Sequence, residues 1–378
     1  MVTHFAHHLL SGLPVPLLPF IRSGFGLDYT QSGLVISAFQ LSSGISQLPG
    51  GWLADRFGAR ILVTIGVAGV GVAGLLVGLS QNYVMLIVFL VLMGLLGGGY
   101  HPASPPLIAA SVAPEKRGRA LGIHMIGGSG SWFLSPLIAA AIAATWGWRG
   151  PFIALAIPTI IFGIMFYVLM GRLRPTKKAE RKVTGSSIET PSQGRWRRLV
   201  QFLVLRTSTG ALVRSTMSFI PLFLVDHFGA SEGAAAASMA LIFSGGLWVA
   251  PLSGYLSDRV GRLTLIVAAC FLSGPVIYLF TLAPYGLGTS AVLIAIGIIV
   301  YVIEPASQAY IVDEAPEHRR SLIMGIYFFS ATEGSGVLTP VLGYVIDKIG
   351  FYSSVTIVSI ALVVVTLLCS IWLWASRH

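Results

Sequence analysis

Three ionisable side chains interrupt long apolar stretches of this sequence. Arg214 lies in the stretch 199–225, and Glu304 and Glu333 lie in two later ones. A carboxyl group in a medium of low dielectric constant can exchange a proton near neutral pH, so either glutamate could be a proton-coupling site, with the deeper Glu333 preferred. Arginine stays charged at any depth. We therefore expect Arg214 to hold an anionic group of a ligand, or to pair structurally with Glu333 or Glu304.

Histidines occur in the same apolar context. His101 and His124 are candidates for ligand binding and for proton exchange, respectively, because imidazole titrates near neutral pH; polar packing inside a helix bundle is the alternative for both. His4, His7 and His8 are three and four residues apart, which places them on one face of a helix. No acidic residue or cysteine lies near them in the sequence. We therefore expect these three to anchor the chain at the membrane interface, and we expect no metal site.

Amide and aromatic side chains could form the walls of a ligand cavity, because drug-like ligands are bound by flat apolar surfaces with a few polar contacts. The candidates are Gln40, Trp132, Trp248, Tyr301 and Tyr327. Packing against lipid or other helices is the alternative for each of them. The glycine-rich runs 94–99 and 127–131 are not followed by Gly-Lys-Ser/Thr, so the sequence indicates no phosphate-binding loop and no cofactor.

The composition defines the medium in which these side chains lie. Of the 378 residues, 55% are hydrophobic and only 10% are charged, whereas soluble domains have about 25% charged residues. A transmembrane helix needs about 20 apolar residues. We therefore expect an all-α integral membrane protein with twelve transmembrane helices, at 4–24, 30–54, 61–80, 83–111, 119–145, 150–170, 199–225, 232–256, 263–284, 288–312, 321–346 and 350–374.

The basic residues predict the orientation of these helices. If the chain begins in the cytoplasm, most of the 24 Lys and Arg residues fall on the cytoplasmic side, and only Arg22, Arg149 and Lys348 lie at the outer ends. Positive charge is retained on the cytoplasmic side of membrane proteins. We therefore expect an inner (plasma) membrane protein with both termini in the cytoplasm. The formal net charge of +10 then follows from topology, and no nucleic-acid partner is expected.

A repeat relates the two halves of the chain. Residues 50–60, "GGWLADRFGAR", reappear as "SGYLSDRVGRL" at 253–263, so that Gly51 corresponds to Gly254, 203 positions later. His101 corresponds to Glu304 with the same displacement. Matched anchors of this kind are typical of transporters built from two parallel repeats. The basic, polar segment between the halves is typical of a linker, which predicts a six-helix bundle at 1–170, a cytoplasmic linker at 171–198 and a second six-helix bundle at 199–378.

These features resemble the major facilitator superfamily over essentially the whole chain. Its loop signature G-x-L-x-D-x-x-G-[RK] is present as "GWLADRFGAR" and is echoed by "GYLSDRVGRL". The stretches "GGGYHPASPPLIA" and "LVRSTMSFIPLFLV", with the segment from "LPVPLLPFIRSGFG" through the signature, are similar to the fosmidomycin-resistance and related drug-efflux branch. The fifth helix departs from the usual antiporter signature, because its glycines cluster at 127–130 and proline follows only at Pro136.

The resemblance implies a conformational latch at the repeated loop. The latch would stabilise the outward-facing state, and its residues would be Gly51, Asp55, Arg56 and Gly58, with Asp258 and Arg259 as a weaker second copy. We expect Gly51 and Gly58 to let helix and loop approach their neighbours closely. We expect Asp55 to accept hydrogen bonds from a helix N-terminus or to pair with an arginine. A topology anchor that never moves is the alternative.

The expected activity is secondary active transport by alternating access, and not catalysis, because no catalytic set of residues occurs at plausible spacing. The leading hypothesis is proton-coupled efflux of a small amphipathic or anionic compound by a monomer in the lipid bilayer. Proton-linked uptake of a metabolite anion, such as a carboxylate or sugar acid, is the alternative within transport. A non-transporting membrane receptor or scaffold is the alternative outside it.

Overall fold

The computed structural model describes residues 1–172, 193–316 and 320–375, and these are almost entirely helical, without a strand. The expected all-α membrane fold is confirmed. The first half of the chain comprises α1 (Val2–Ser11), α2 (Leu18–Phe25), α3 (Tyr29–Phe57), α4 (Ala59–Thr64), the π-helical turn η1 (Ile65–Gly69), α5 (Val70–Gly78), α6 (Tyr83–Gly97), α7 (Tyr100–Ser111), the short 3₁₀ helix η2 (Pro114–Lys116), α8 (Arg117–Trp146) and α9 (Arg149–Arg172).

The second half consists of six long helices that correspond to the six predicted spans. They are α10 (Gln193–Phe228), α11 (Glu232–Val260), α12 (Arg262–Leu282), α13 (Leu287–Glu314), α14 (Arg320–Ile349) and α15 (Phe351–Ala375). Helix α10 begins six residues before the predicted boundary at 199, so the end of the predicted linker 171–198 is helical. The part of that linker at 173–192 lies outside the described residues.

Three predicted spans of the first half are interrupted helices. The span 4–24 is broken between α1 and α2 at "GLPVPL", where two prolines remove backbone donors. The span 61–80 contains η1, and the span 83–111 is divided into α6 and α7. Within the described residues, nine helical segments are long and apolar enough to cross a membrane. The remaining predicted spans, α1 with α2, α3 and α14, are also helical, and α3 and α14 pack on each other between the two halves.

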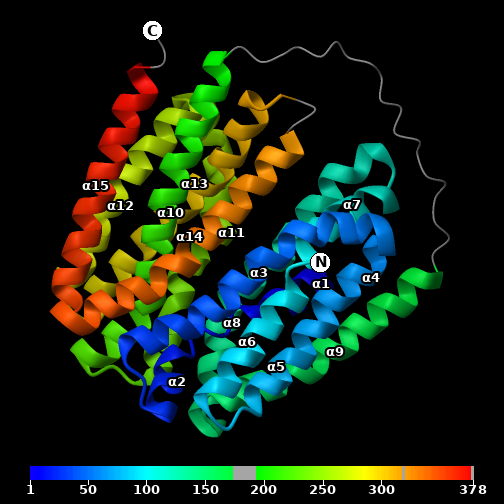
Figure 1. Cartoon of the computed structure of the whole chain (residues 1–378), viewed down its shortest axis with the longest axis horizontal. Helices are drawn as coiled ribbons and strands as arrows, with labels where there is room; N and C mark the ends of the chain where they lie inside the picture. Colours follow the sequence, from blue (N-terminus) through cyan, green and yellow to red (C-terminus); the bar gives the residue numbers. More distant parts are fainter. Residues whose placement is uncertain (173–192, 317–319, 376–378) are drawn as a thin grey trace.

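The two halves lie side by side and meet along two pairs of helices (Figure 1). Helix α3 packs along α14, and α8 packs along α11. The contact between α3 and α14 is close: a Cβ atom at Gly33 would lie 2.8 Å from the Pro340 Cα, and the Ser37 hydroxyl donates a 2.6 Å hydrogen bond to the Gly336 carbonyl. Small residues permit such approach of two helix backbones.

Backbone conformation repeats with the same displacement as the sequence. Six of the seven glycines with positive φ in the described residues form pairs 203 positions apart, at Gly26 and Gly229 (65° and 64°), Gly58 and Gly261 (93° and 93°), and Gly147 and Gly350 (66° and 80°). Only glycine adopts these angles without strain. The helix ends of the two halves are therefore built alike.

The apolar core is continuous between the halves at one end of the molecule and divided at the other. The largest buried cluster includes Leu18 and Ile21 of the first half together with Phe219 and Phe223 of the second. Two smaller clusters belong to one half each, one around Tyr100 and the other around Tyr310. We call the joined end, where α2 and α10 terminate, the Arg22 face, and the opposite end, where α3 and α11 terminate, the Asp55 face.

Candidate functional site

Polar contacts between the halves close the Arg22 face. Arg22, in the last turn of α2, forms an ion pair with Asp226, near the end of α10, and the Tyr29 hydroxyl donates a 2.5 Å hydrogen bond to the same carboxylate. The Ser23 hydroxyl donates to Glu232 at the start of α11. Each contact joins residues from different halves, so together they hold this face shut.

A second carboxylate adds to this closure. Asp347, in the last turn of α14, accepts hydrogen bonds from the backbone amides of Tyr29 and Thr30 at 3.0 and 2.8 Å and from the Thr30 hydroxyl at 2.6 Å. These amides lie at the start of α3, where backbone donors have no partner inside the helix and negative charge is favourable. Asp347 therefore caps a helix of the other half.

The ring contacts and the ion pair described for the predicted latch residues at the Asp55 face each lie within one half. The Arg56 guanidinium lies 5.4 Å from the Trp52 ring, and Arg259 lies 4.4 Å from the ring of Tyr255. Asp258 pairs with Arg262 at 3.6 Å, one turn along the chain, and its side chain is 69% exposed. Within the described ranges, no ion pair of Asp55 occurs. Among the described residues, no ion pair therefore joins the two loops in this conformation.

The expected role of the signature glycines in close packing is wrong for this conformation. A Cβ atom at Gly51 or Gly58 would meet no neighbouring atom within 4 Å. Gly58 is required for a different reason, since its φ of 93° lies in a region that side chains rarely adopt, and Gly261 has the same angle. This turn lets α4 begin directly after α3 ends.

Buried charges meet in the second half, where α10, α13 and α14 come together. The Glu304 carboxylate lies 3.7 Å from the Arg206 guanidinium and 3.9 Å from that of Arg214. The Tyr327 hydroxyl donates to Glu304 at 3.1 Å and accepts from Arg206 at 3.3 Å. Of the two partners considered for Arg214, the structure brings Glu304 to it and leaves Glu333 elsewhere.

Arg206 was not among the expected site residues, although it is the most buried charged member of this network. Its side chain is 7% exposed, against 25% for Glu304 and 47% for Arg214. It precedes Arg214 by eight residues, about 12 Å along the helix axis, and both long side chains reach one carboxylate between them. The signal in the sequence was a second arginine in the same apolar stretch.

Two further aromatic candidates, Trp248 and Tyr301, lie on α11 and α13. The Tyr301 ring packs over the α11 backbone, where a Cβ atom at Gly245 would lie 2.8 Å from it. Trp248 is 45% exposed, and its indole nitrogen donates to the Ser244 hydroxyl at 3.4 Å. The Tyr301 ring is thus packed against α11, whereas much of the Trp248 side chain is exposed.

Glu333 and Gln40 lie at the contact between α3 and α14. Any side chain at Gly44 would overlap the Glu333 carboxyl group, which rests on the α3 backbone. The Glu333 Oε1 atom is buried and has no hydrogen-bond partner within the part of the chain described. The amide oxygen of Gln40 accepts a 3.2 Å hydrogen bond from Ser335. Both side chains therefore lie between the halves.

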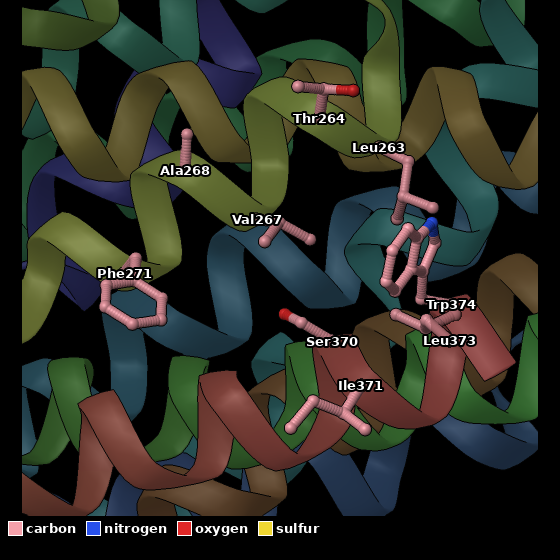
Figure 2. Close-up of a pocket in the computed structure, with 9 residues that line it drawn as sticks. All are labelled: Leu263, Thr264, Val267, Ala268, Phe271, Ser370, Ile371, Leu373 and Trp374. Carbon is pink, nitrogen blue, oxygen red and sulfur yellow. The ribbon is translucent and has the colours of Figure 1, made fainter.

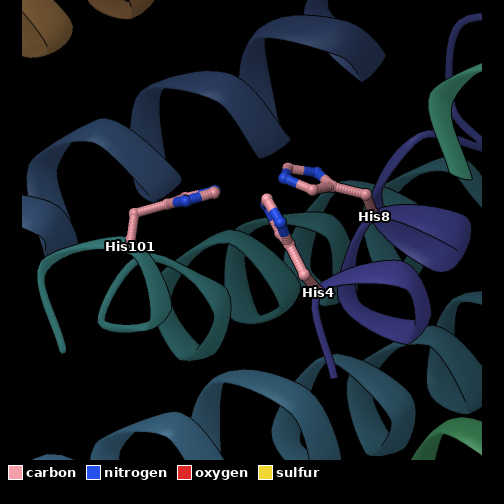
Figure 3. Close-up of side chains that lie close together, drawn as sticks. All are labelled: His4, His8 and His101. Carbon is pink, nitrogen blue, oxygen red and sulfur yellow. The ribbon is translucent and has the colours of Figure 1, made fainter. Parts of the chain in front are cut away.

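The histidines of α1 lie inside the first half, and the expectation that they anchor the chain at the membrane interface is wrong. His4 and His7 are each 4% exposed. The His4 ring stacks on that of His124 at 4.1 Å, and its Nδ1 lies 2.9 Å from the His124 carbonyl oxygen. His101 from α7 approaches the same group (Figure 3). The folded bundle offers them buried polar partners that a surface position would lack.

Trp132 links this histidine group to the other half. Its ring lies 5.3 Å from that of His8 and 5.2 Å from that of Phe243 in α11. Apart from Trp248, the expected ligand-lining candidates thus fall into three groups, around Glu304, at the contact of α3 and α14, and around the histidines.

Two of the hollows in the described part of the molecule are lined by none of the expected site residues. The larger is a groove of about 480 Å³ between α12 and α15 (Figure 2), lined by Leu263, Thr264, Val267, Ala268, Phe271, Ser370, Ile371, Leu373 and Trp374. Its apolar walls belong to two membrane-crossing helices, which suits contact with lipid. The smaller, of about 220 Å³, lies beside Arg22 and Asp226.

Comparison with known families and sequences gives consistent results. A family model described as Major Facilitator Superfamily matches residues 1–337. The multidrug resistance protein MdtG of Citrobacter koseri is 30% identical over 274 residues, which cover 69% of this chain and 66% of that protein, slightly under two thirds of its length. The probable sulfoacetate transporter SauU of Cupriavidus necator is 27% identical over 383 residues, which cover 94% of this chain and 87% of that protein.

Solved structures share the fold. A bacterial homolog of the human lysosomal transporter Spinster, in an inward-facing and occupied conformation, superposes with a TM-score of 0.80 at 17% identity and covers 100% of this chain and 95% of its own. A POT family transporter in complex with 5-aminolevulinic acid has a TM-score of 0.80 at 14% identity, with the same coverage. The likeness at these identities concerns the fold. The family match over residues 1–337 shows that this chain belongs to the major facilitator superfamily and is a multi-pass membrane protein.

Proposed function

We propose that this protein exports a small amphipathic or anionic compound from the cytoplasm by proton-coupled alternating access, as a monomer in the inner membrane with both termini in the cytoplasm. The observation that carries the proposal is the environment of Arg214. Its side chain is 47% exposed in the middle of a membrane-crossing helix, beside Glu304. A charge at this depth must face water or a charged partner, not lipid. Arg214 therefore supports a wet substrate path between the halves.

The two faces of the molecule support alternating access. The Arg22 face is joined by an ion pair, hydrogen bonds and a continuous core, whereas the ring contacts described for the latch residues of the Asp55 face lie within one half. With the Asp55 face in the cytoplasm, as the basic residues predict, this conformation is inward-facing. The opposite conformation would break the contacts around Asp226 and bring the two latch loops together.

Glu333 supports proton coupling. Its Oε1 is buried without a partner at the contact of α3 and α14. An unpaired carboxylate is costly in such a place, so the protonated form is favoured while these helices touch. Separation of α3 and α14 would admit water and let the proton leave. Proton release would thereby be linked to the opening of the Arg22 face.

Flux measurements in proteoliposomes test this proposal. Candidate compounds are applied against an imposed pH gradient, and internal pH is followed with a trapped dye. We expect substrate-dependent proton flux that Glu333→Gln abolishes. The control Glu314→Gln removes a carboxylate that pairs with Arg198 near a helix end, and it should keep the flux. Unchanged flux in Glu333→Gln would exclude that residue from coupling.

A second experiment tests substrate recognition. Replacement of Arg214 by Ala should weaken transport of anionic compounds more than transport of neutral ones, because only the former need its charge. Equal losses for both classes would contradict an anion-binding role.

Proton-linked uptake of a small metabolite anion is the second candidate. The half-exposed Arg214 is compatible with it, and so is the likeness of 94% of the chain to a protein named a probable sulfoacetate transporter. Transport in right-side-out and inverted vesicles under the same pH gradient distinguishes the two candidates. Accumulation inside right-side-out vesicles would favour uptake, and accumulation inside inverted vesicles would favour efflux.

A further inference from the structure

We propose that His4, His8 and His101 form a binding site for a transition-metal ion of the Zn²⁺ class. One ring nitrogen from each of the three lies within 4.8 Å of the others. His4 and His8 come from α1, and His101 comes from the start of α7, 93 positions later than His8. Figure 3 shows the three rings converging on one point between the two helices. Metal binding at this site does not depend on the transported substrate proposed above.

The geometry requires only a small adjustment to hold an ion. His4 and His8 lie one helical turn apart, with ring centroids separated by 4.8 Å, and His101 lies 5.8 and 5.0 Å from them. Zinc binds imidazole nitrogen at about 2.0–2.1 Å in a tetrahedral arrangement, which places ligand nitrogens about 3.4 Å apart. Each nitrogen therefore needs to move by less than about 1 Å. The exposed His101 ring can rotate to provide this movement.

The proton on His4 is already placed as a metal ligand requires. Its Nδ1 lies 2.9 Å from the carbonyl oxygen of His124, which can only accept a hydrogen bond. Nδ1 must therefore carry the proton, and Nε2 offers its lone pair. Metal-bound histidines commonly donate their other N–H to a backbone carbonyl, because this fixes the tautomer and the ring orientation.

Neighbouring rings hold the α1 side of the site in place. His124 stacks on His4 with its ring plane tilted by only 8°. His7 stacks on Tyr100 at 4.5 Å, and its Nδ1 lies 2.8 Å from the Gly66 carbonyl oxygen. Helix α1 is thus fixed by its other histidines, and His4 is held in position before any ion arrives. A preorganised ligand of this kind strengthens binding.

The ligand types select the class of metal. The group contains three imidazoles and, within the described residues, no carboxylate. Imidazole suits zinc, copper, nickel and cobalt, whereas Mg²⁺ and Ca²⁺ require oxygen ligands. Three histidines leave a fourth coordination position open for water or an anionic ligand.

Metal titration of the purified protein tests the site. The protein is purified with an affinity tag that lacks histidine, stripped with a chelator and titrated with Co²⁺, whose visible absorption reports its coordination. We expect one Co²⁺ per chain, displaced by Zn²⁺ and unaffected by millimolar Mg²⁺. His8→Ala and His101→Gln should each weaken binding at least about tenfold.

Two further variants keep the test decisive. His227→Gln removes a histidine that contacts Tyr352 at the Arg22 face and should bind Co²⁺ as the wild type does. His101→Cys supplies a thiolate in place of the imidazole, so it should retain Co²⁺ and add a sulfur charge-transfer band. Equal binding by wild type and His101→Gln, or the absence of that band in a folded His101→Cys protein that still binds Co²⁺, would overturn the proposal.

Discussion

The Glu304 carboxylate of α13 lies 3.7 Å from the Arg206 guanidinium of α10, where the arginine side chain is 7% exposed. A buried charge is tolerated only when it is paired. The burial of the Arg206 charge therefore depends on its pair with Glu304. Arg214 is half exposed beside the same carboxylate and can turn to water or to a ligand. The same carboxylate thus pairs with a buried arginine that contributes to the stability of the fold and lies beside a half-exposed arginine that can bind a ligand.

Glu304→Gln should destabilise the protein, because it leaves Arg206 buried with only Tyr327 as an uncharged partner. We expect a loss of about 2 kcal/mol, within the range for leaving a buried polar group without its partner. Thermal unfolding in detergent measures it. Glu314→Gln is the control, since its pair with Arg198 is partly exposed and should contribute at most about 1 kcal/mol. Equal shifts in the two variants would contradict a structural role for Glu304.

Asp226→Asn should open the Arg22 face, because it removes the charge that attracts Arg22 and weakens the hydrogen bond from Tyr29. A loss of about 1 kcal/mol changes the ratio of two conformations about fivefold. Cysteines placed at the adjacent positions 23 and 232 should then cross-link more slowly, in proportion to the smaller fraction of closed molecules.

The control for this experiment is Asp313→Asn. It breaks a pair with Arg262 that lies within one half, so cross-linking between positions 23 and 232 should proceed at the rate of the unmutated pair. A slowing in this variant as large as that in Asp226→Asn would show a general effect of lost charge.

Gly33→Val should destabilise the closed Arg22 face, because any side chain at this position meets the backbone at Pro340. Backbone atoms cannot rotate away, so the halves must separate locally. We expect a labelling reagent to reach a cysteine at position 37 faster in the variant than in its parent. Gly130→Val is the control, since a Cβ atom there meets nothing within 4 Å. Unchanged labelling in Gly33→Val would contradict the close contact of α3 with α14.

Gly58→Ala should lower the stability of the protein by about 1–2 kcal/mol, because a side chain is strained at a φ of 93°. Gly261→Ala, at the same angle in the second half, should cost a similar amount. Chemical denaturation in detergent gives both values. Gly51→Ala belongs to the same motif but has a helical backbone and open space around it, so its stability should not fall by more than a few tenths of a kcal/mol. A loss in Gly51→Ala equal to that in Gly58→Ala would exclude backbone strain as the cause.

The sequence by itself determined the spans, the repeat and the family. Apolar runs of sufficient length, the 203-residue displacement and the doubled signature are local properties of the chain, and the helices and the paired glycine angles agree with them. The depth of Arg214 also followed from counting along a helix. Each of these conclusions needs only the rise per residue of a helix, the hydropathy of the residues and the spacing of the motifs along the chain.

Only the tertiary structure decided which of these side chains meet. It paired Arg214 with Glu304, placed Glu333 against Gly44 in the other half, and brought His101 to His4. Such contacts depend on the rotation of each helix about its axis and on which helix packs beside it. In a chain whose helices are apolar on nearly every side, the hydrophobic pattern does not set that rotation; the close packing of small residues and buried polar groups does.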